Sequence, residues 1–204
     1  LKKWSLSGSE VHVVFMTNGN TGIDRTKNID KKNVADVRMA EAKKATKILG
    51  VKKIKTLNIP CQTVSNNQKT FHKVIKKIRE IKPNLVLTHS EFDKHRDHRI
   101  TATLVKEACW KARENIHPEL GRAWHVGDLW AYEISDLLPR VDFVVDITET
   151  FNHKKKAYKK YFSQHNIVGG MWEHIDGLTK VRGYMVGTKR GEAFMRVSST
   201  PILI

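Results

Sequence analysis

Residues 85–98 read LVLTHSEFDKHRDH, a short apolar run followed at once by a cluster of histidines and acids. The run from Asn84 to Leu87 has the composition of a buried strand, and Pro83 stops the helical pattern that precedes it. From Ile100 to Ala112 apolar residues return at helical spacing, so the cluster is expected between a strand and a helix. In open α/β sheets ligands bind beyond the carboxyl ends of the strands, which is the position of this cluster.

The rest of the chain alternates strands and helices in the same way. We expect strands at residues 10–16, 51–59, 129–134 and 141–147, and helices at 33–49, 71–81 and 151–162. Short apolar runs between glycines at 181–197 indicate turns and short strands. The alternation predicts one domain over residues 1–204 with an α/β fold of Rossmann-like type. We expect a three-layer αβα sandwich, in which helices cover both faces of a mainly parallel sheet.

The composition restricts the environment and the partners. No apolar run approaches the roughly 18 residues of a membrane span. Cys61 and Cys109 form no CxxC pair, so a reducing, cytoplasmic setting is expected. The net charge of +16 raises a polyanionic partner as a hypothesis. Helical spacing at 71–81 nevertheless turns the lysines outward, and the basic runs lack the aromatics that stack on bases. Solvated helix faces are therefore favoured over a nucleic-acid surface.

The chemistry of the cluster depends on its residue types. Imidazole and carboxylate groups together can bind a divalent metal and move a proton, so the cluster indicates a hydrolytic metal site, with a solvated polar loop as the alternative. His89 is interpreted as capping the strand or packing under the loop. We expect His98 at or just before the start of the following helix, whose positive end favours a developing oxyanion.

With these pieces in order, the chain resembles the PIG-L/LmbE family of zinc-dependent de-N-acetylases. The resemblance covers nearly the whole sequence and rests on VVFMTNG at 13–19, RMAE at 38–41, DKHRDH at 93–98 and VDITE at 145–149. It implies an N-acetylated amino sugar as substrate and zinc, or another divalent metal, as cofactor. It also implies that homo-oligomers can form.

The resemblance assigns roles within the cluster. His98 matches a zinc ligand of the family. His95 matches the histidine that stabilises the oxyanion and protonates the leaving amine, and Asp97 matches the aspartate that orients and charges it. Arg96 stands where members commonly carry proline, which leaves the functional side chains in place.

Two further residues are expected to bind substrate. Arg38 matches the family arginine that reaches into the substrate pocket, and Asp93 lies where members carry tyrosine or aspartate. An ordinary side-chain pair between Arg38 and Glu41, three residues apart on a helix, is the alternative for the arginine.

The family motif His-Pro-Asp-Asp-Glu, which provides two zinc ligands and the general base, is absent from this sequence. Residues 1–8 resemble the helix that follows that motif, so we expect the chain to lack the first strand and part of the active site. Two hypotheses result: a zinc-dependent hydrolase that removes an N-acetyl group from an amino sugar or glycoside, or a catalytically inactive, basic module that binds nucleic acid or another polyanion.

Overall fold

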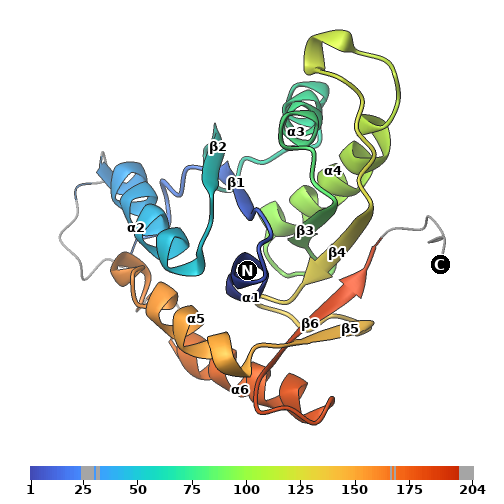
Figure 1. Cartoon of the computed structure of the whole chain (residues 1–204). Helices are drawn as coiled ribbons and strands as arrows, with labels where there is room; N and C mark the ends of the chain where they lie inside the picture. Colours follow the sequence, from blue (N-terminus) through green and yellow to red (C-terminus); the bar gives the residue numbers. More distant parts are fainter. Residues whose placement is uncertain (24–29, 31–32, 166, 168, 198–204) are drawn as a thin grey trace. The chain divides into compact units, whose positions relative to one another are not determined.

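The computed structural model describes residues 1–23, 30, 33–165, 167 and 169–197 (Figure 1). Its contacts divide the chain into two compact units, one from residues 1–63 and 146–192 and the other from residues 64–145 and the stretch from Ala193 onward. Each unit combines segments that are distant in the sequence. The expectation of a single domain stays a prediction. Among the described residues, no helix has the length and apolar character needed to cross a membrane.

The described residues of the first unit form a parallel pair of strands and several α-helices. Its elements are α1 (Lys2–Leu6), β1 (His12–Thr17), α2 (Val34–Leu49), β2 (Lys53–Ile59), α5 (Phe151–Tyr158) and α6 (Met171–Tyr184). β1 and β2 pair in parallel, with His12 opposite Lys53. α2 ends at Gly50, whose φ of 76° is the left-handed conformation that glycine adopts without strain. The helix predicted at 33–49 and both predicted strands are therefore confirmed here, whereas the helix predicted at 151–162 ends at Tyr158.

The second unit is built around a sheet of four strands. Its elements are α3 (Gln68–Ile81), β3 (Leu85–His89), α4 (Arg96–Ala112), β4 (Asp128–Tyr132), β5 (Phe143–Asp146) and β6 (Gly191–Arg196). The last residue of β5 and the first two of β6 belong to the first unit. α3 packs against α4, and α4 against β3 and β4 (Figure 1). Buried Ala131, Leu138, Ala193 and Met195 form a core cluster.

The expectation of a mainly parallel sheet is wrong. The strand order is β3-β4-β6-β5, and β4 pairs in parallel with β3 but antiparallel with β6. Strand direction depends on where the chain enters the sheet, which the alternation of strands and helices along the sequence does not fix for every strand. The mixed α/β character is confirmed, while the three-layer arrangement stays a prediction.

The expectation of turns from residue 181 is also wrong in its first part, because α6 extends to Tyr184. Glycine weakens the helical signal there. Gly183 is nevertheless required, since a Cβ on it would lie 2.7 Å from the backbone nitrogen of Arg190 and 2.7 Å from the carbonyl oxygen of Thr188. Tertiary packing therefore overrides local propensity at this position.

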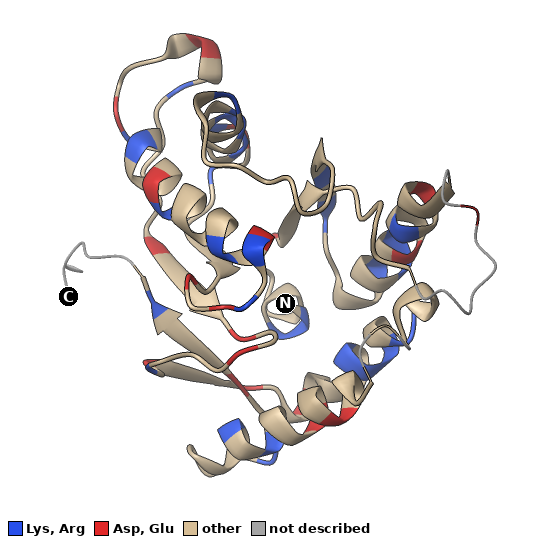
Figure 2. Cartoon of the chain, turned by 180° about the vertical axis from the view of Figure 1, so that it is seen from behind, with Lys and Arg blue, Asp and Glu red and all other residues tan. Residues whose placement is uncertain are grey.

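Basic residues occur on helices of both units (Figure 2). Several form pairs along their own helix, such as Lys77 with Glu80 on α3 and Lys180 with Asp176 on α6. These pairs agree with the interpretation of the lysines as solvated helix surface.

Candidate active site

The predicted cluster lies in the second unit, between the carboxyl end of β3 and the start of α4. His95 is the N-cap of α4, and its Nδ1 accepts a hydrogen bond from the backbone N–H of Asp97 at 3.2 Å. This cap starts the helix at Arg96 rather than at Ile100. The placement of His98 at or before the helix start is therefore corrected, because His98 lies inside the first turn.

Two imidazole rings stack on that of His98. Its ring centroid lies 4.1 Å from that of His89 and 4.4 Å from that of His95. Burial lowers the pKa of His98, an effect that nearby Asp93 opposes. Burial also lowers the pKa of His89 to about 3, and the neighbouring His98 adds to the shift. His98 is thus neutral near neutral pH, which leaves a ring nitrogen lone pair free to bind a metal.

His89 also contacts the next strand, because its ring centroid lies 5.3 Å from that of Tyr132 on β4. Burial raises the pKa of Tyr132, so its phenol stays neutral. The packing interpretation of His89 agrees with this position. The stacking of His89 on His98, however, was not expected from the sequence.

Asp93 lies behind His98. The Asp93 side chain is 3% exposed, and its Oδ1 lies 3.1 Å from Nδ1 of His98, although the approach does not meet hydrogen-bond geometry. The same Oδ1 accepts from the backbone N–H of His95 at 2.8 Å, and Oδ2 accepts from that of Ser135 at 3.5 Å. These contacts direct the carboxylate toward His98, and its expected role in binding substrate stays a prediction.

Asp97 contributes through its backbone and its side chain. Its backbone N–H donates to His95 Nδ1, which places the proton of a neutral His95 on Nε2. Its buried carboxylate accepts from the backbone N–H of Val64 at 3.4 Å. The structure therefore brings His95, Asp97 and His98 together with Asp93, as the sequence predicts.

Arg38 belongs to α2 in the first unit. Its Nη1 lies 3.3 Å from Oε2 of buried Glu41, and its guanidinium lies 5.1 Å from the ring centroid of Tyr161. Glu41 also accepts from the backbone N–H and the hydroxyl of Ser163, at 2.9 Å and 2.7 Å. The alternative pair with Glu41 is therefore present, and substrate binding by Arg38 stays a prediction.

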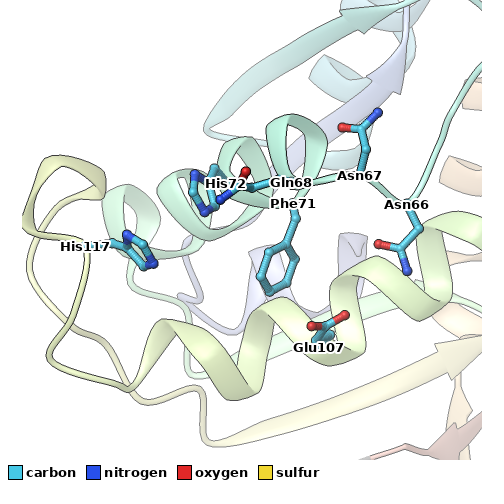
Figure 3. A pocket seen from close by; sticks show the side chains of 7 residues that line it. All are labelled: Asn66, Asn67, Gln68, Phe71, His72, Glu107 and His117. Atoms are coloured by element: carbon cyan, nitrogen blue, oxygen red, sulfur yellow. The ribbon is translucent and has the colours of Figure 1, made fainter.

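A cavity of about 320 Å³ lies elsewhere in the second unit, beside α3 and α4 (Figure 3). Its lining combines amide side chains with Phe71 and two histidines, His72 and His117. None of the predicted site residues lines it. The cluster is thus separate from this cavity.

Residues 1–109 match the family described as PIG-L: GlcNAc-PI de-N-acetylase. The chain belongs to the PIG-L family. The predicted family is thereby confirmed, and the matched residues include the whole of the cluster from Asp93 to His98.

Relatives of this PIG-L chain include deacetylases. Diacetylchitobiose deacetylase from Thermococcus kodakarensis is 25% identical over 201 residues, which cover 94% of this chain and 74% of the relative. The structure of N,N'-diacetylchitobiose deacetylase from Pyrococcus horikoshii, bound to an inhibitor, matches with a TM-score of 0.85 at 25% identity, over 98% of this chain and 79% of that one.

The same fold also occurs in an enzyme of another class. The 4-carboxy-2-hydroxymuconate hydratase from Pseudomonas putida matches with a TM-score of 0.82 at 22% identity, over 100% of this chain and 91% of that one. This likeness shows the fold alone. Because one fold carries different reactions, the activity of this PIG-L protein has to be argued from its site.

The PIG-L family implies a bound metal, which the residues of this site would have to coordinate. His98 is neutral, half-buried and backed by a carboxylate, which suits one ligand position. No group of three or more His, Cys, Asp or Glu side chains that could hold a metal occurs within the described residues. This part of the chain therefore fits one ligand of a zinc site rather than a complete set.

Proposed function

We propose that this protein is a zinc-dependent hydrolase that removes the N-acetyl group from an N-acetylated amino sugar or glycoside. The observation that carries the proposal is the neutral His98, stacked between His89 and His95 with Asp93 behind it. Membership of the PIG-L family and the deacetylases among the relatives support it.

His98 would hold the zinc ion, or another divalent metal, through Nε2. Asp93 faces the other ring nitrogen, Nδ1, and so fixes the ring as carboxylates do behind metal-binding histidines. A bound zinc ion would polarise the acetyl carbonyl and lower the pKa of water. Any further ligands would come from outside the described residues, within which no group of three or more candidate ligands occurs.

His95 would act on the acetyl group. Its Nε2–H can donate to the carbonyl oxygen as that oxygen gains negative charge, and the positive end of α4 favours the same charge. When the C–N bond breaks, the amine takes up the proton that the attacking water has lost, and His95 can deliver it. Asp97 would orient His95, because its backbone N–H donates to Nδ1 and holds the ring in place.

Acetate release by the full-length protein tests the proposal. N-Acetylglucosamine and diacetylchitobiose serve as substrates, and the protein is stripped with a chelator and then supplied again with zinc. We expect activity that requires zinc and is lost in His98→Ala, whereas His174→Ala, changed at an exposed histidine, retains it. Equal activity in wild type and His98→Ala would overturn the assignment.

The net charge of +16 supports a second candidate, an inactive basic module that binds a polyanion. This candidate predicts no acetate release and nucleic-acid binding that weakens steeply as salt is raised. Binding that persists at high salt, or zinc-dependent acetate release, would exclude it.

A further inference from the structure

The carboxyl end of α6 exposes large apolar side chains on one face. Val181 is 56% exposed, Tyr184 86%, Met185 52% and Val186 49%. Val181, Tyr184 and Met185 are three and four residues apart, so they project from the same side of the helix. Contiguous exposed apolar surface of this kind marks a protein or membrane contact in soluble proteins.

The opposite side of this helix end is well packed. Thr179 and Gly183 are buried, and the chain returns closely past Gly183, where Thr188 donates from its backbone N–H to the Gly183 carbonyl at 2.9 Å. Arg190 donates to the carbonyl oxygen of Asp176 at 2.8 Å and to Thr179 Oγ1 at 2.9 Å. The exposed face is therefore held by ordered structure on its other side.

Basic residues surround the exposed face. Residues 177–191 contain Lys180, Arg182, Lys189 and Arg190 and no Asp or Glu. Asp176, just before this segment, forms ion pairs with Lys180 and Arg190 at 2.8 Å each. Figure 2 shows basic residues at this end of α6. The local charge is thus positive around an apolar centre.

An apolar centre with a basic rim is complementary to an anionic lipid surface. Aromatic and aliphatic side chains enter the boundary between headgroups and acyl chains, and Lys and Arg meet the phosphates. A second copy of the chain would instead bring two positive rims together, which Coulomb repulsion opposes. Charge complementarity therefore favours an anionic lipid surface over a second copy of the chain.

We propose that the α6 tip, defined as Val181, Tyr184, Met185 and Val186 with Lys180, Arg182 and Lys189, docks on an anionic membrane surface. Such docking is peripheral and needs no membrane-spanning helix. It is independent of the proposed catalytic function, because it involves none of the residues assigned to the candidate active site.

Co-sedimentation of the full-length protein with lipid vesicles tests this proposal. Vesicles of phosphatidylcholine alone are compared with vesicles that also contain phosphatidylserine. We expect binding only to the phosphatidylserine vesicles, and weaker binding as ionic strength rises. Equal binding to both kinds of vesicle, or binding to neither, would overturn the proposal.

The net charge of the whole chain also attracts anionic vesicles, so the decisive variant leaves charge unchanged. The double variant Tyr184→Ser, Met185→Ser should bind at least about tenfold more weakly than wild type, since two apolar side chains no longer leave water. The matched control Leu6→Ser, Leu137→Ser alters two apolar side chains elsewhere that are 65% and 57% exposed. It should bind as wild type does, and circular dichroism checks that both variants fold.

A second comparison isolates the basic rim. Arg182→Gln, Lys189→Gln should weaken vesicle binding by more than Lys43→Gln, Lys44→Gln, which removes the same charge from exposed positions of α2. Equal losses in the two variants would assign the binding to overall charge and overturn the proposal. Sedimentation equilibrium provides the remaining outcome: a dimer that depends on Tyr184 and Met185, without vesicle binding, would make a second copy the occupant.

Discussion

Nδ1 of His98 lies 3.1 Å from Oδ1 of Asp93, on a ring that is stacked between two other imidazoles. The carboxylate is 3% exposed, whereas the imidazole is 22% exposed. One edge of the His98 ring therefore faces a buried carboxylate, and the partly exposed remainder of the ring can bind a ligand. The same relationship determines how Asp93 should respond to mutation.

Asp93→Asn should weaken zinc binding by about 10- to 100-fold, because a neutral amide orients and charges a metal-binding histidine less well than a carboxylate. It should also lower the pKa of His98 further in the metal-free protein, since Asp93 now opposes the effect of burial. Competition with a zinc chelator and NMR titration of His98 measure the two effects. Glu91→Gln, at an exposed neighbour, is the control. Unchanged zinc affinity together with an unchanged titration would contradict this role.

Stability should fall as the pH decreases below neutrality. His89 has a pKa of about 3 in the folded protein against 6.5 for the free side chain, so the unfolded chain binds more protons between these values. The contribution of His89 is thus complete above pH 6.5 and is lost as pH falls toward 3, with a slope of at most about 1.4 kcal/mol per pH unit. Urea unfolding at several pH values should show a shallower slope in His89→Gln than in His174→Gln. Equal slopes would contradict the assignment.

Arg79→Lys should destabilise the second unit by about 2 to 4 kcal/mol. The buried Arg79 guanidinium donates to five carbonyl oxygens, those of Ala112, Glu114, Ile116, His117 and Gly121. An ammonium group has only three donors and leaves some of these oxygens without a partner. Urea unfolding measures the loss of stability. The control Arg113→Lys, at an exposed position directly after α4, should show little change.

Gly183→Ala should cost about 1 to 3 kcal/mol, because the new Cβ would collide with the backbone of Thr188 and Arg190. Gly177→Ala in the same helix is the control, since a Cβ there meets nothing within 4 Å. It should stabilise the protein by about 0.5 to 1 kcal/mol, which is the usual gain for alanine over glycine inside a helix. Thermal melting measures the stability of both variants. A destabilised Gly177→Ala together with an unchanged Gly183→Ala would contradict the prediction.

Arg38→Met should distinguish substrate binding from a structural ion pair. A substrate contact predicts a raised KM for acetate release with little change in kcat, because uniform binding energy is lost. A pair that serves only Glu41 predicts lower stability without a change in KM, since the buried carboxylate would lose its cation. Steady-state kinetics and urea unfolding on the same preparation decide between them.

Local pattern was sufficient for the elements around the site. The apolar run before His89 and the helical spacing after Ile100 predicted β3 and α4, because both signals come from residues close in the chain. The alternation also predicted a helix at 33–49, which is α2 (Val34–Leu49) in the structure. The exact start of α4 was missed because a histidine, His95, acts as its N-cap, a role usually taken by Ser, Thr, Asp or Asn.

The sequence by itself determined the residue types of the site, their order and their place between a strand and a helix. Only the tertiary structure decided that β6 runs antiparallel to β4, that His89 packs against Tyr132 on β4, and that Val64 holds the Asp97 carboxylate. The physical reason is range: propensity and periodicity act over a few residues, whereas these contacts depend on segments that meet only when the chain has packed.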